Sequence, residues 1–302
     1  MELKLTEKDI KLMTFLKRYK IIEGKECKKI YNSTEYHYKR LKQLENEHYI
    51  KRINRYYIKL DTKGIKLIKD IGYDYKNVCR KPRYKERVKE ITSIATITLD
   101  SDIEFIPSWE MKDETIYTEI GRKYIGQIKY LQTDFITYYI SKEKEFIYIR
   151  QVINDIQKTI NYNNALIFIE NNKILSKSNQ YFILGKDSTL IVNPTEINLK
   201  RMKLLQKMDI YEILEILYRG KEILLSDWLK ADFVTEDKQY ILFMPFIDTE
   251  KLHRLNIFYN NNKVFKRKID ILTLSENKDK INEILTNRTN IIEIDKLLGV
   301  IE

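Results

Sequence analysis

The sequence is poor in the residues that build disulfide frameworks, metal sites and long flexible linkers. Its 302 residues include two cysteines, three histidines, eight glycines and four prolines. Two cysteines cannot form a disulfide framework, and His37, His48 and His253 lack metal-ligand spacing. We therefore expect a thiol-reduced, cytoplasmic protein that uses neither a metal nor another cofactor.

Long apolar runs are also missing. No stretch approaches the roughly 18 uncharged apolar residues of a membrane span, so no membrane partner is expected. The first residues, MELKLTEKDIK, lack the apolar core of a signal peptide. No glycine-rich loop precedes a Lys-Ser or Lys-Thr pair, which argues against ATP-driven function. The 43% of apolar residues nevertheless suffices for the cores of two or three domains.

Positive charge is concentrated at one end of the chain. Residues 1–90 carry 26 lysines and arginines against 13 acidic residues, a net charge of +13. Residues 91–302 carry 29 against 31, a net charge of −2. A basic module attached to a near-neutral body is typical of proteins that bind a polyanion, and nucleic acid is the commonest such partner. The charge distribution predicts double-stranded DNA as a partner.

The basic segment begins with signals for three helices. Thr6, followed by acidic residues, predicts the N-cap of a helix that ends near Tyr19. A short helix is expected over residues 24–31, with Cys27 and Ile30 inward. Ser33 or Thr34 caps a third helix, STEYHYKRLKQLENE, whose Tyr38, Leu41 and Leu44 follow the spacing of a buried face.

A hairpin and a fourth helix follow. The runs 49–53 and 56–60 are apolar and aromatic, and Asn54-Arg55 between them predicts a β-hairpin. Thr62 is expected to cap a helix, TKGIKLIKDIG, that stops at Gly72.

This order, with the string QLENEHYIKRINRYYIKLDTKGIKLI, resembles the winged-helix family. His48 stands where many such domains have glycine, because the chain turns there with a positive φ. The resemblance implies that the third helix enters the major groove and that the hairpin, or wing, contacts the flanking backbone. The residues expected at DNA are Ser33, Thr34, Tyr36, His37, Lys39, Arg40, Gln43, Arg52, Asn54 and Arg55.

Individual roles follow from side-chain chemistry. Arg40 and Gln43 are the candidates for base readout, because they can bond bidentately to guanine and adenine respectively. Lys39 is expected at a phosphate. In the second basic stretch, residues 73–90, four cations either follow phosphates beside the wing or belong to an ordinary solvated linker. These are Arg80, Lys81, Arg83 and Lys85.

The body is predicted to be α/β. A helix that follows Pro82 and ends near Leu99 precedes strand-like runs at IEFIPSW, KYIGQIKYL, DFITYYI and EFIYIRQV, then a helix through VINDIQKTINY and a buried strand at ALIFIE. This order resembles a restriction-endonuclease-like core. Together with the basic winged helix, it resembles the replication-relaxation group of proteins of bacterial plasmids and integrative elements, over residues 4–200. We predict a winged helix at 1–75, a linker at 76–90, the core at 91–200 and an extension at 201–302.

Endonuclease cores of this kind hold Mg²⁺ with an Asp on one strand and a Glu-X-Lys on the next. Asp134 stands where the first acid falls, but the next run offers Tyr148-Ile149-Arg150. Glu145 lacks a lysine two residues later, and Glu110 and Glu119 fit only a different arrangement. We therefore read the core as degenerate and the protein as a non-enzyme.

Residues 201–302 predict further helices and two more buried strands, in KQYILFMPFI and KRKIDILTL, around the helix TEKLHRLNIFY. This region is expected to extend the sheet, to support self-association or to bind a protein partner. The resemblance favours a replication initiator or maintenance factor of a mobile element. A transcriptional repressor is the alternative, and a Mg²⁺-dependent nuclease is the third.

Overall fold

The computed structural model describes residues 3–33, 35–53, 55–75, 82–99, 101–111, 123–159, 161–228, 230–262, 269–285 and 289–299, and only the backbone of 82–85. Backbone contacts divide the chain into unit 1, residues 1–111, and unit 2, residues 112–302. The fold is mixed α+β, as the sequence predicts, with helices and sheets of both strand orientations. Among the described residues, no helix has the length and apolar character that crossing a membrane requires.

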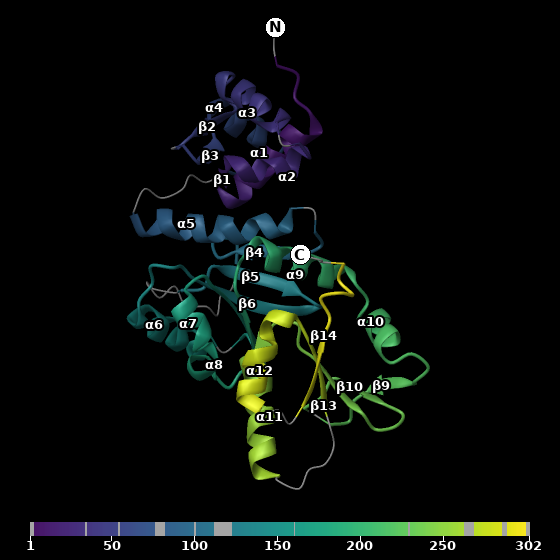
Figure 1. Cartoon of the computed structure of the whole chain (residues 1–302). Helices are drawn as coiled ribbons and strands as arrows, with labels where there is room; N and C mark the ends of the chain where they lie inside the picture. The colour runs from purple at the N-terminus through teal and green to yellow at the C-terminus, as the bar shows by residue number, and fades with distance from the viewer. Residues whose placement is uncertain are drawn as a thin grey trace. The chain divides into compact units, whose positions relative to one another are not determined.

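Unit 1 contains the helices and the hairpin predicted for the basic segment (Figure 1). Its elements are α1 (Glu7–Tyr19), β1 (Ile22–Glu23), the 3-10 helix η1 (Gly24–Cys27), α2 (Lys28–Tyr31), α3 (Tyr36–Asn46), β2 (Ile50–Arg52), β3 (Tyr57–Leu60), α4 (Thr62–Asp70), α5 (Pro82–Ala95), the 3-10 helix η2 (Thr96–Thr98) and β4 (Glu104–Pro107). Strands β1, β3 and β2 form a small antiparallel sheet in that order.

Local chemistry sets the ends of these helices. Thr6 and Asp9 form a capping box at the start of α1, since each side chain bonds the backbone N–H of the other residue. His48, just after α3, has a φ of 61°, which confirms the predicted turn. Asp61, not Thr62, occupies the N-cap position of α4. The helix ends at Asp70, two residues before Gly72, whose φ is 88°.

The core of unit 1 lies where α1 and α3 meet the sheet and α4. Its apolar side chains come from positions three and four apart on the helices and from alternate positions on β3. They include Leu12, Met13, Leu16, Leu41, Leu44, Ile58, Leu60 and Ile68, none more than 1% exposed. The register pairs Ile22 with Ile58 and Ile50 with Leu60, so the buried residues of all three strands share one face.

Helix α5 and strand β4 also belong to unit 1. The Tyr19 hydroxyl donates to the Phe105 carbonyl at 2.9 Å, and the two rings stack with centroids 5.9 Å apart. The Thr92 hydroxyl donates to the Tyr19 carbonyl at 3.2 Å. The chain therefore divides after Met111 and not at the predicted linker of residues 76–90.

Unit 2 contains two sheets with helices on their faces. Within unit 2, the strands of the first sheet follow the order β12-β8-β7-β6-β5, in which β6, β7 and β8 are parallel and β12 and β5 are each antiparallel to their neighbour. Its strands are β5 (Gly126–Tyr130), β6 (Thr133–Ile140), β7 (Asn164–Ile169), β8 (Ser188–Val192) and β12 (Ile247–Asp248), and its helices are α6 (Phe146–Lys158), α7 (Asn172–Ser176), α8 (Ser178–Tyr181) and α11 (Thr249–Asn261). The run ALIFIE is the buried β7, as predicted.

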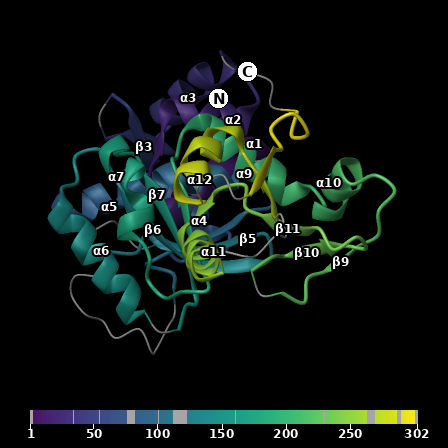
Figure 2. The same ribbon diagram turned by 60° about the horizontal axis from the view of Figure 1, so that its bottom comes forward.

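The second sheet has the order β14-β13-β11-β10-β9, and Figure 2 shows its β11, β10 and β9 side by side. It consists of β9 (Ile223–Leu225), β10 (Phe233–Thr235), β11 (Tyr240–Phe243), β13 (Ile269–Thr273) and β14 (Asn290–Glu293), and its neighbouring helices are α9 (Glu196–Lys207), α10 (Ile210–Leu217), the 3-10 helix η3 (Ser275–Asn277) and α12 (Lys278–Leu285). The two further strands and the helix between them confirm the predicted elements of residues 238–274.

One predicted strand is wrong. The run EFIYIRQV, residues 145–152, forms the first half of α6 and not a strand. Ile149, Val152 and Ile156 are buried at a helical spacing, while Phe146 and Ile147 are exposed. The residues also fit the alternating pattern of a strand, and only their burial in the structure separates the two periods.

Close packing at Gly64 gives a test of unit 1. Gly64 lies on the buried side of α4, where an added Cβ would overlap the carbonyl oxygen of Tyr49. We expect Gly64→Ala to destabilise unit 1 by about 1–3 kcal/mol, because backbone must move to admit the methyl group. Urea unfolding in a Trp228→Phe background would report this, since Trp109 then reads unit 1 alone through its bond to the Arg18 carbonyl. Lys66→Ala, exposed on the same helix, is the control and should change stability by less than about 0.5 kcal/mol.

Candidate nucleic-acid interface

Helix α3 has one buried and one exposed face, and the division differs from the predicted one. The buried residues are spaced by three and four: His37, Arg40, Leu41 and Leu44. The prediction that His37 and Arg40 face outward is therefore wrong. Tyr38, predicted to be inward, is 52% exposed, which also corrects that prediction.

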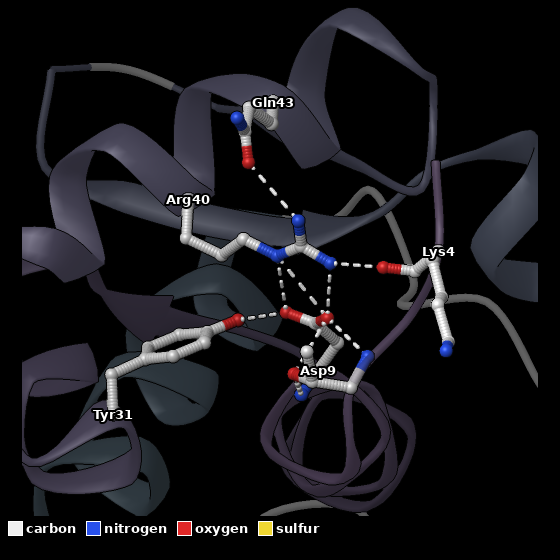
Figure 3. Close-up of polar contacts among 6 residues, drawn as sticks. Lys4, Asp9, Tyr31, Arg40 and Gln43 are labelled. Atoms are coloured by element: carbon white, nitrogen blue, oxygen red, sulfur yellow. Dashed lines mark hydrogen bonds and ion pairs between the residues drawn. The ribbon is translucent and has the colours of Figure 1, made fainter. Parts of the chain in front are cut away.

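Arg40 is buried because it pairs with a buried carboxylate of α1. Its Nη2 lies 2.6 Å from Oδ2 of Asp9, and its Nε lies 3.1 Å from Oδ1 (Figure 3). Asp9 is fully buried and also accepts from the Tyr31 hydroxyl at 2.8 Å and from the backbone and hydroxyl of Thr6. Each oxygen of the carboxylate thus has at least two donors, which compensates its loss of hydration.

Asp9, Arg40, Tyr31 and Thr6 form a hydrogen-bonded cluster, which shifts the pKa values of its ionisable members in opposite directions. Burial by itself raises the pKa of Asp9, but the hydrogen bonds from Arg40, Thr6 and Tyr31 outweigh it and hold the pKa below the ordinary 3.8. The hydrogen bond to Asp9 raises the pKa of Arg40. Burial and the same carboxylate raise the pKa of Tyr31 far above its ordinary value. The pair is therefore charged at neutral pH.

The guanidinium of Arg40 also fixes the side chain of Gln43. Its Nη1 donates to Oε1 of Gln43 at 3.0 Å, and its Nη2 donates to the Lys4 carbonyl at 2.7 Å. A guanidinium offers only donors, so chemistry requires the amide oxygen of Gln43 to face Arg40. The amide nitrogen points away from the cluster, as Figure 3 shows, and Gln43 is partly exposed.

Ser33 and His37 form local hydrogen bonds at the start of α3. The Ser33 hydroxyl accepts from the backbone N–H of Tyr36 at 3.0 Å, although Glu35 occupies the N-cap position. Nδ1 of His37 lies 2.8 Å from the Ser33 carbonyl, and the ring is 2% exposed. The structure therefore places both residues in local hydrogen bonds and leaves His37 outside the exposed face.

The exposed face of α3 carries tyrosines and lysines. Tyr36 and Tyr38 are each about half exposed, and Lys39 and Lys42 lie beside them. The hairpin adds exposed Arg55 next to Tyr56, which is 67% exposed. We call Tyr36, Tyr38, Lys39, Lys42, Gln43 and Arg55 the basic face.

Most nearby acids are already neutralised. Three of them form ion pairs: Glu45 with Arg52, Glu47 with Lys63 and Asp61 with Lys51. Burial by itself raises the pKa of Asp61, but the hydrogen bond from Lys51 leads the effects that lower it below 3.8. Within the described part of the chain, no hydrogen bond or ion pair engages the side chains of Lys39, Lys42 or Arg55. These three cations remain available to an anion, and the exposed Glu35 at the N-cap position of α3 is a nearby acid.

The other predicted contacts divide into two groups. Arg52 is exposed but bonds Glu45 through its Nε at 3.2 Å. Thr34, Asn54, Arg80 and Lys81 lie outside the described residues, and Arg83 and Lys85 lie in α5, where only the backbone is described.

Three of the four acids considered for a nuclease site lie in the described residues, each in a different part of the chain. Asp134 is exposed on β6, and Glu145 is the N-cap residue of α6. Glu110 belongs to unit 1 and accepts from Nε of Arg18 at 2.9 Å, and Glu119 lies outside the described residues. No group of three His, Cys, Asp or Glu side chains that could hold a metal ion occurs in the described part of the chain.

Sequence reasoning missed Asp9, Lys42 and Tyr38 as members of this region. Asp9 had a signal: it occupies the apolar stripe of α1 with Leu12, Met13 and Leu16. A carboxylate in such a stripe requires a cationic partner. Lys42 had a signal too: on a helical projection it lies opposite the buried Leu41 and Leu44, which predicts that it is exposed. Comparisons with models of protein families, with curated proteins and with solved structures found no match to this chain.

The lowered pKa of Asp9 predicts a loss of stability in acid. A carboxylate whose pKa is lower in the folded state stabilises that state fully above its unfolded pKa, here 3.8, and loses this contribution as pH falls through the folded value. In the Trp228→Phe background, urea unfolding followed by Trp109 from pH 6 to pH 2.5 should therefore show a steep decline of stability below about pH 4. Asp9→Asn should make the decline shallower, although it lowers stability at pH 6, because Arg40 loses its charged partner. Asp61→Asn should retain the part of the decline that belongs to Asp9. Equal slopes for wild type and Asp9→Asn would contradict the assignment.

Proposed function

We propose that unit 1 binds double-stranded DNA sequence-specifically, with α3 in the major groove. The observation that carries this proposal is the basic face, where Lys39, Lys42 and Arg55 lack intramolecular partners among the described residues and lie next to tyrosines that are half or more exposed. A net charge of +13 over residues 1–90 supports the same partner, because phosphate contacts supply much of the affinity of DNA-binding proteins.

We further propose that residues 1–75 are a winged helix. The order of α1, α2, α3, hairpin and α4, with the small sheet β1-β3-β2, supports this assignment. The positive φ of His48 at the turn after α3 supports it too. In this arrangement the β2–β3 hairpin is the wing, and Arg55 reaches the backbone or minor groove beside the helix.

The basic face suits a division of tasks on DNA. Lys39 and Lys42 each carry a compact ammonium group on a long, flexible side chain, which suits a phosphate. The hydroxyls of Tyr36 and Tyr38 suit phosphates or sugars. These contacts position α3 but carry no direct sequence information. Arg40, held by Asp9, takes no part in base readout and acts as a positioning residue.

Gln43 is the remaining candidate for reading a base. Bidentate recognition of adenine requires both the amide oxygen and the amide nitrogen of a glutamine. Arg40 already binds the oxygen, so Gln43 offers only N–H donors. We propose that it reads an acceptor on a base edge, O6 or N7 of guanine, in place of the adenine expected from its residue type.

The biological setting follows from the resemblance to replication-relaxation proteins. We propose a replication initiator or maintenance factor of a mobile element, and the same binding activity would also serve a repressor. A DNA footprint separates the two roles: tandem direct repeats in an origin favour replication, and one inverted repeat over a promoter favours repression.

The basic face gives a quantitative test of DNA binding. We expect the full chain with Lys39→Ala and Lys42→Ala to bind duplex DNA more weakly, with a salt slope reduced by about 0.9 for each phosphate that the protein no longer neutralises. Titrations of a labelled duplex between about 50 and 200 mM salt would measure the slope. Lys173→Ala with Lys200→Ala removes the same charge from exposed positions of unit 2 and is the matched control. Equal slopes for the two double variants would exclude the basic face as the DNA site.

Gln43 gives a test of specificity. Once selection from random duplexes has identified a site, Gln43→Ala should reduce discrimination at one guanine by on the order of 1–3 kcal/mol. Replacing that guanine by 7-deazaguanine should weaken the wild type and leave Gln43→Ala little changed, if N7 is the acceptor. A Gln43-dependent preference for adenine that disappears with purine, which lacks the 6-amino group, would show that the amide oxygen is free and contradict the assignment.

A further inference from the structure

Unit 2 contains an open pocket of about 880 Å³, a volume within the range of small-molecule sites. Its walls come from the β5–β6 hairpin, the starts of β7 and β8, the end of α9, the start of α10, and the stretches 231–233 and 243–248. Most of the wall is apolar, and five aromatic side chains contribute to it: Tyr130, Phe135, Phe233, Phe243 and Phe246. Walls of this kind suit an apolar organic molecule.

The hairpin turn gives the pocket a wall that is fixed before a ligand arrives. Leu131 and Gln132, the two residues of the turn, have positive φ angles of 47° and 61°, which cost free energy in residues other than glycine. Gln206 of α9 holds the turn, because its Oε1 accepts the Leu131 N–H at 2.8 Å. Binding therefore does not need to order this part of the chain.

Acidic residues outnumber cations around the pocket. Four aspartates line it, Asp187, Asp209, Asp232 and Asp248, against one cation, Lys251, and this leaves a net charge of −3. Lys251 is not available to an anion, since its Nζ lies 2.9 and 3.1 Å from the two carboxylate oxygens of Asp232. Among the described residues, the other three aspartates form no ion pair with a lysine or arginine.

These three carboxylates differ in their access to a ligand. Asp248 is 1% exposed and accepts from the Ser188 hydroxyl at 2.6 Å and from three backbone N–H groups, so it acts through its charge alone. Asp187 and Asp209 are exposed, and Asp209 accepts from the Tyr211 N–H at 3.0 Å as the N-cap of α10. Lys186, next to Asp187, donates its Nζ to two backbone carbonyls instead. Asp187 and Asp209 can therefore contact a cation directly.

Tyr130 adds an unmade hydrogen bond. Its ring lies opposite Phe246 with centroids 6.5 Å apart, and both residues line the pocket. The hydroxyl is buried and has no partner among the described residues. Burial raises the pKa of Tyr130 far above its ordinary value, so the hydroxyl keeps its proton. Buried polar groups usually have a partner, and a polar atom of a bound molecule would supply one here.

We propose that this pocket binds an organic cation, an apolar and largely aromatic molecule with one positive charge. The aromatic side chains attract a cation to their faces, and the carboxylates of Asp187, Asp209 and Asp248 supply the complementary charge. The apolar wall covers the rest of the molecule. A carboxylate or phosphate finds no free cation on this wall, since Asp232 already binds Lys251. The site lies in unit 2 and does not depend on the proposed binding of DNA.

Isothermal titration calorimetry on the full chain without DNA tests the charge preference. Tetraphenylphosphonium is the probe, and triphenylphosphine oxide, which is neutral and also rich in phenyl groups, is the control. The chain has a net charge of +11, so general electrostatics repel a cation, and only a local acidic site favours it. We expect saturable binding of one tetraphenylphosphonium per chain, on the order of tenfold tighter than triphenylphosphine oxide. Absence of saturable binding, or equal affinities for the two probes, would overturn the proposal.

Variants of the wall test the location. Asp187→Asn with Asp209→Asn should weaken tetraphenylphosphonium binding by about tenfold, and Asn still serves as an N-cap at residue 209. Asp279→Asn with Glu283→Gln removes the same charge from exposed positions of α12, outside the pocket, and should bind as the wild type does. Equal weakening by the two double variants would show a general effect of charge and contradict the site.

Ala231→Trp provides a second test, because it places a large side chain in the pocket. It should abolish binding of tetraphenylphosphonium while the circular dichroism spectrum remains that of the wild type. Unchanged binding by Ala231→Trp would place the cation elsewhere and overturn the proposal. All these changes lie in unit 2, so their DNA affinity should equal that of the wild type, and loss of the cation site would leave the proposed function intact.

Discussion

The buried pair of Asp9 and Arg40 is the interaction on which the arrangement of unit 1 depends. It joins α1 to α3, and through Gln43 and the Lys4 carbonyl it also fixes a surface side chain and the segment before α1. Burying two charges costs hydration free energy that their attraction only partly offsets, so the pair is a weak source of stability. Its contribution is geometric, because an uncompensated charge would remain if α3 rotated about its axis. Apolar contacts alone would permit several such rotations.

Ion pairing divides the cations of unit 1 into two populations. Arg40, Lys51, Arg52 and Lys63 are engaged with carboxylates, whereas Lys39, Lys42 and Arg55 are not, within the described residues. Exposed pairs of this kind each contribute little free energy, and salt screens them. Their main effect is to remove acids that would repel a polyanion from the basic face. A net charge alone therefore overstates the number of side chains that are free for a partner.

The sequence predicted the features of unit 1 that depend on local chemistry. Thr6 as a cap and the hairpin formed by the runs 49–53 and 56–60 follow from a few neighbouring residues, the turn at His48 follows from the resemblance to winged helices, and all three appear in the structure. The faces of α3 could not be predicted in this way. Tyr38 and Arg40 both fit the spacing of a buried face, so the pattern does not show which of them is buried. The structure buries Arg40 because it pairs with Asp9, 31 residues earlier. In α6 the run FIYIRQV satisfies both a helical and a strand period, so tertiary contacts decide between them.

The link between Gln43 and the core has a consequence for how such a surface changes over generations. A residue that touches only solvent and a ligand can be exchanged freely, and each exchange samples a new preference. Position 43 is different, since its acceptor atom belongs to the same hydrogen-bonded network as Asp9. Altered recognition here requires coordinated change at a solvent-facing residue and at two enclosed ones. Such a network slows divergence at this position and leaves Lys39, Lys42 and the hairpin as the part of the surface that varies first.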